Sequence, residues 1–160
     1  MIKAAWEGVT LLRVKSTLTG GAWNPPGYMG KIIEFPDYNS GNGLWHGDQW
    51  TKNIIAEELG HSWDIRGDLF GGWNGGHISQ AMIPYIGAST RDCAGLIYLC
   101  WNYQPGQEAP VNNHHASLNP VEDWGGAFAQ FVEPLPAQNL GPLREQYIKI
   151  QIALLVTEIK

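Results

Sequence analysis

Side chains with metal-binding chemistry cluster in one short stretch of the sequence. His61 stands four residues after Glu57 and three after Glu58, so a helix would place the three on one side, and Asp64 would join them one turn later. Two adjacent carboxylates and an imidazole are costly to bury unless a positive charge lies between them. The pattern therefore predicts a divalent-cation site on a helix. The structural alternative is a solvated acidic helix face.

The same stretch, Glu57-Glu-Leu-Gly-His-Ser-Trp-Asp64, resembles the HExxH motif of zinc metallopeptidases in its HELGHxxD form. The resemblance implies that Glu58 is the general base and that His61 is a metal ligand. Where the family has its first metal-binding His, this sequence has Glu57, which we expect to be a ligand in its place. The exchange adds a negative charge, so harder ions such as Mn²⁺ or Ca²⁺ gain relative to Zn²⁺.

A second segment, residues 115–132, contains Asn-Pro-Val-Glu-Asp and resembles the NPxEDFAExFA helix of gluzincins related to the anthrax lethal factor catalytic domain. This resemblance implies that Glu122 is the third metal ligand. It also implies that His115, which stands at the position of a family Tyr, stabilises the oxyanion. The family's second Glu is replaced by Gly126. As a structural alternative, Glu122 stands three residues after Asn119, which fits a capping box.

The two resemblances together imply a single α+β, zincin-like domain over residues 1–160, with a small mixed or antiparallel sheet packed on the metal-site helix. A strand at Lys31–Phe35 would pair with an extended peptide or protein substrate. The implied function is metal-dependent peptide-bond hydrolysis of the zinc type. The alternative is a non-catalytic module that binds a peptide or glycan. Minor candidates for a fourth ligand are His46 and His77. His114 and His115 are the other histidines of interest, and His115 could also supply the missing imidazole.

Glycines within the expected site helices indicate how these helices meet. Gly60, Gly125 and Gly126 each cost up to about 1 kcal/mol relative to Ala in a helix interior. A close approach of the two helices would account for all three. Such an approach explains the glycines without any chemistry, and it is also what a metal shared by His61 and Glu122 requires.

The remaining elements follow from turn residues and from the spacing of apolar residues. Strands are expected at Val9–Lys15 and Tyr28–Phe35, and the metal-site helix from Asp48 until Gly67. A second helix should open at Asn119-Pro120 and stop before Pro134. Arg91–Tyr103 is predicted to be a buried helix, although its short apolar run also fits a strand. From Pro142 onward we favour a helix over a strand.

Composition excludes several classes of protein. The 160 residues carry a net charge of −5 without a basic stripe, which argues against nucleic acid as a partner. No apolar run approaches the ~20 residues of a membrane-spanning helix, and no export signal is visible. The sequence predicts neither the compartment nor the oligomeric state.

Cys93 and Cys100 are expected to be buried thiols, because on one helix their Cα atoms would lie ~10 Å apart.

Overall fold

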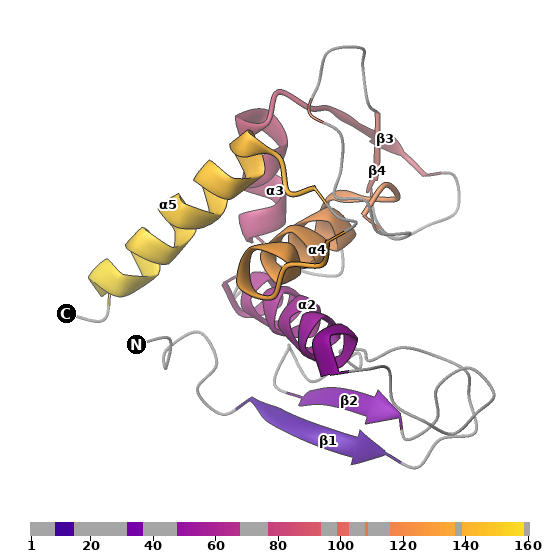
Figure 1. The fold of residues 1–160 in the computed structure, drawn as a ribbon. Coiled ribbons are helices and arrows are strands. Elements are labelled where there is room, and N and C mark those ends of the chain that lie inside the picture. The colour runs from indigo at the N-terminus through magenta and orange to yellow at the C-terminus, as the bar shows by residue number, and fades with distance from the viewer. Residues whose placement is uncertain are drawn as a thin grey trace.

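Helices and two small sheets make up the computed structural model (Figure 1). It describes residues 9–14, 32–36, 48–67, 77–93, 99–102, 108, 116–136 and 139–158. In chain order the elements are β1 (Thr10–Val14), β2 (Ile32–Pro36), α2 (Asp48–Gly67), α3 (His77–Tyr85), β3 (Thr90–Asp92), β4 (Leu99–Trp101), α4 (Pro120–Val132) and α5 (Pro142–Glu158). The predicted α+β class is confirmed.

The bounds of three helices agree with the local signals in the sequence. α2 spans the predicted stretch, and α4 begins directly after its cap residue Asn119 and ends before Pro134. Pro142 begins α5, which decides the final element in favour of a helix. α3 was not predicted. Its signal is the four-residue spacing of Ile78, Met82 and Ile86, all of which are buried.

The two sheets differ in strand direction. β1 and β2 pair in parallel, with Thr10 opposite Ile32, whereas β3 and β4 pair antiparallel, with Thr90 opposite Trp101. β2 contacts α2, whose other neighbours include α3 and α4. Because the strands at α2 run parallel, the antiparallel arrangement, one of the two expected beside the metal-site helix, was wrong for the described strands. The predicted strand before α2 is present as β2.

The stretch predicted as a helix at Arg91–Tyr103 instead contributes β3 and β4. The antiparallel pairing brings Cys93 and Cys100 to a Cα–Cα distance of 5.4 Å, and the two residues form a disulfide. The prediction of two buried thiols was therefore wrong. It assumed helical spacing, whereas a hairpin folds the chain back and brings residues seven positions apart into contact.

The core lies between α2, α3, α4 and α5 and is rich in aromatic rings. The ring of Trp63 meets the rings of Trp124 and Phe128 edge-to-face, with centroid distances of 5.5 and 5.7 Å. Trp101 is also buried, so these tryptophans serve the core. Among the described residues, no helix has a stretch that is long and apolar enough to cross a membrane.

Candidate metal centre

α2 supplies the first part of the site. Its helical turn places Glu57 and His61 four residues apart on the face that meets α4. Glu57 is partly exposed, whereas Glu58 and His61 are buried. The helix therefore buries an imidazole beside carboxylates, the arrangement that the sequence predicted to need a cation.

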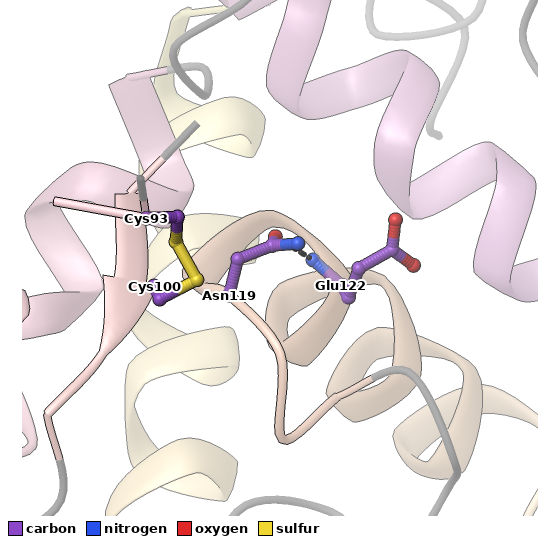
Figure 2. Close-up of a disulfide and its surroundings, with 4 residues drawn as sticks. All are labelled: Cys93, Cys100, Asn119 and Glu122. Atoms are coloured by element: carbon purple, nitrogen blue, oxygen red, sulfur yellow. Dashed lines mark hydrogen bonds between the residues drawn. A yellow bond between two sulfur atoms is a disulfide. The ribbon is translucent and has the colours of Figure 1, made fainter. Parts of the chain in front are cut away.

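The first turn of α4 supplies the second part of the site. The side chain of Asn119 accepts a hydrogen bond from the backbone N–H of Glu122 at 3.0 Å, and Pro120 begins the helix. Figure 2 shows the Glu122 carboxylate extending away from Asn119. The capping role of Asn119 thus fixes the backbone of Glu122 and leaves its carboxylate directed toward α2.

Two glycines bring the helices close enough for these side chains to meet. A Cβ atom on Gly60 would lie 3.4 Å from the Cα atom of Gly125. A Cβ atom on Gly125 would lie 2.6 Å from Nε2 of His61, so the imidazole occupies the space that a larger residue would fill. The indole N–H of Trp124 donates to the carbonyl of Gly60 at 2.8 Å and fixes the contact. The predicted close helix approach is confirmed at Gly60 and Gly125.

Glu57, His61 and Glu122 together form a group that could hold a metal ion. One ligand atom from each residue lies within 4.8 Å of the others. Nε2 of His61 lies 3.6 Å from Oε2 of Glu122. Ligands bound at ~2.1 Å in a tetrahedral site are about 3.4 Å apart, so this pair already has nearly the required separation. The structure thus brings together the three residues that the sequence predicted as ligands.

The electrostatics of the group favour a cation. Burial by itself lowers the pKa of His61 and is the largest single effect, but the hydrogen bond to Glu122 and the charge of that carboxylate act in the opposite direction. The charges of Glu58 and Glu57 also act in this direction, so the pKa of His61 is raised from 6.5 to about 10. Nδ1 of His61 is buried and has no hydrogen-bond partner among the described residues. Nε2 is therefore the ring atom that faces the acidic partner and the atom available to a metal.

Other predicted residues do not join this group, or lie outside the described part of the chain. Asp64 is fully buried and accepts a hydrogen bond from the backbone N–H of Ser79 at 2.8 Å, so it serves the first turn of α3. It was expected on the face of the metal ligands, and it does not belong to the group that could hold a metal. His115, the predicted oxyanion donor, lies outside the described residues, as do His46 and His114, and the side chain of His77 is not described.

A buried ion network beside Glu122 was not predicted from the sequence. Arg144 is fully buried and binds the carboxylate of Asp123 with two nitrogens, Nε at 2.9 Å and Nη2 at 2.7 Å. Its Nη1 donates to Glu108 at 3.0 Å. Such charges stay buried only when they are paired, and here the pair joins the first turn of α4 to the first turn of α5. No local sequence pattern links residues 21 positions apart.

Comparison of this chain with family models, with curated proteins and with solved structures finds no match. The chemistry of the site is therefore argued from its own geometry.

Proposed function

We propose that Glu57, His61 and Glu122 bind a divalent cation and that the chain uses it to hydrolyse peptide bonds. The observation that carries the proposal is the gathering of these three ligand atoms from two helices within 4.8 Å. A structural role alone does not require an imidazole to be buried between carboxylates. In this proposal the domain is zincin-like, and its substrate is a peptide or a protein.

The donor set supports a cation that accepts oxygen ligands. Two carboxylates and one neutral imidazole carry a charge of −2, which balances a divalent ion without a further anion. A His, His, Glu set would carry −1. We therefore expect Mn²⁺ or Ca²⁺ to compete with Zn²⁺ at this site better than they do at a two-histidine site.

When bound, the cation would supply Lewis-acid polarisation of a peptide carbonyl and of the attacking water. Glu58 is the residue assigned to move protons. It follows the ligand Glu57 on α2 and is 8% exposed, and its charge acts on His61. In this role Glu58 takes a proton from the attacking water and passes it to the leaving amine. His115 would donate to the oxyanion, as the resemblance implies.

A metal titration separates the binding step from the catalytic step. After removal of metal with a chelator, the protein is titrated calorimetrically with Zn²⁺, Mn²⁺ and Ca²⁺. We expect one ion per chain, and we expect His61→Ala to abolish the binding heat. If none of the three ions binds the wild-type protein, the proposed metal centre is wrong.

Cleavage is then measured with an unfolded protein and a peptide library, with chelator or with the ion that binds. Glu58→Gln should keep the metal affinity within about threefold and lower the cleavage rate at least 100-fold, the scale of a general base. Glu145→Gln, the same substitution on helix α5 at a carboxylate that pairs with Lys149, serves as the matched control and should retain activity. Stoichiometric metal binding without any cleavage would refute the hydrolase and favour the non-catalytic binding module.

A further inference from the structure

The hairpin of β3 and β4 is fastened at both ends. Each strand has only three residues, and a two-stranded hairpin of this size is marginal in water. At one end the disulfide joins Cys93 to Cys100. At the other end the backbone N–H of Asn102 donates to the carbonyl of Ser89 at 2.9 Å, and the Ser89 hydroxyl donates to the carbonyl of Asn102 at 3.1 Å.

β4 is hydrogen-bonded to the turn that precedes α4. Trp101 follows Cys100, and its backbone N–H donates to the carbonyl of Leu118 at 3.2 Å. Asn119, the residue after Leu118, holds the first turn of α4 through two hydrogen bonds: its side chain accepts from the N–H of Glu122, and its carbonyl accepts from the N–H of Asp123. Figure 2 shows the disulfide beside Asn119, at the end of α4 that carries Glu122. A short chain of bonds therefore runs from the disulfide to the metal ligand.

We propose that the Cys93–Cys100 disulfide is a positioning cross-link that holds Glu122 in place for the metal. This inference rests on the metal site of the proposed function. Once the cross-link is removed, the three-residue ladder has to hold β4 by itself. The support of Leu118 then weakens, and the Asn119 cap and the Glu122 carboxylate become less ordered. Ligands that are not held in place lose metal affinity, by about 10- to 100-fold where a supporting contact is removed.

The first test needs no metal. Amide hydrogen exchange is compared between the wild-type protein and the Cys93→Ser/Cys100→Ser variant. Because the cross-link acts on the first turn of α4, the Glu122 amide should exchange about tenfold faster in the variant. The amide of Glu133, which donates to the carbonyl of Ala129 at the other end of α4, should change much less. An equal acceleration at both ends would show a merely structural disulfide and would overturn the proposal.

The second test is a titration with the ion that binds the wild-type protein. We expect the cysteine variant to bind about tenfold more weakly. The matched control is Ile148→Ala, which removes fully buried apolar atoms on α5 and should lower the melting temperature while keeping metal affinity within about twofold. Wild-type affinity in the cysteine variant would overturn the cross-link without touching the proposed function. A wild-type protein that binds no ion would overturn the proposed function and, with it, the role of the cross-link in metal binding; the exchange data would still show whether the disulfide orders the Glu122 backbone.

Asn119→Ala provides a second route to the same answer if the cysteine variant does not fold. With the disulfide intact it removes the bond to the Glu122 amide, so it should reproduce the faster exchange and the weaker metal binding. Reduction of the folded wild-type protein by a phosphine should do the same. In that reaction the disulfide gains two electrons and two protons, and the phosphine takes an oxygen atom from water. Normal Glu122 exchange after complete reduction would refute the proposal.

Discussion

The strictest test of the site geometry is the substitution Gly125→Ala. A Cβ atom at this position would lie 2.6 Å from Nε2 and 2.9 Å from Nδ1 of His61, whereas ordinary contacts begin near 3.4 Å. The imidazole would have to move by about 0.8 Å, and metal–ligand distances tolerate only about 0.2 Å. We therefore expect His61 to be lost as a ligand and the metal affinity to fall at least about 100-fold, or about 2.7 kcal/mol.

Stability measurements reveal the cause of that loss. Alanine in a helix interior gains up to about 1 kcal/mol over glycine, whereas overpacking of a filled site costs about 1–3 kcal/mol. Gly125→Ala should therefore lower the free energy of unfolding of the metal-free wild-type protein. In a His61→Ala background the imidazole is absent, so the same substitution should raise the free energy of unfolding. Denaturant unfolding of the four proteins measures both effects.

Gly60→Ala is the matched control, because it makes the same change at the same helix contact. Across the helix contact its Cβ atom would meet Cβ and Cδ1 of Phe128 at 3.1 Å, so the side chain that has to give way is that of Phe128. The expected loss of metal affinity is therefore smaller than for Gly125→Ala. The reasoning fails if Gly125→Ala binds metal like the wild-type protein, or if it stabilises the protein equally with and without the imidazole of His61.

Three further predictions follow from the charges. Glu57→His should raise Zn²⁺ affinity relative to Mn²⁺, and unchanged relative affinities in calorimetry would exclude Glu57 as a ligand. Arg144→Met should cost about 3–5 kcal/mol of unfolding free energy because Asp123 stays buried without its partner, and Asp123→Asn in addition should restore part of it. In the metal-free protein the pKa of His61 is raised to about 10, so protonation of its imidazole stabilises the folded state. This stabilisation is complete below pH 6.5 and is lost as the pH rises to about 10, so the free energy of unfolding should fall across that window. The raised pKa of Tyr147 predicts a further fall at still higher pH, and a flat profile would contradict both.

Local signals in the sequence were enough to predict three of the four described helices. Asn119 with Pro120 marks the start of α4, and Pro142 marks the start of α5. Local signals failed where distant contacts decide the structure. The apolar run at Arg91–Tyr103 fits a helix or a strand equally well, and its outcome depends on the disulfide and on the bond from Trp101 to Leu118.

At the candidate site too, local signals predicted positions within a helix, whereas contacts between distant segments were missed. Helical spacing predicted that Glu57 and His61 share a face, whereas the ligand roles of Glu57, His61 and Glu122 were implied by the two resemblances, and the structure brings the three residues together. The partner of Asp64 was missed because it is the N–H of Ser79 on α3, a helix that the sequence analysis did not predict. A missing element thus hid the role of a residue on another element.

The close contact of α2 and α4 at Gly60 and Gly125 is a condition for the proposed metal site. Gly60 and Gly125 weaken their own helices, by up to about 1 kcal/mol each. What they permit is a backbone approach at which Trp124 can donate to the carbonyl of Gly60 and the imidazole of His61 fits over Gly125. Larger residues at these positions would separate α2 from α4, and His61 would then lose its position beside Glu122. A close helix contact could exist without a metal, but a site shared by these two helices could not exist without the contact.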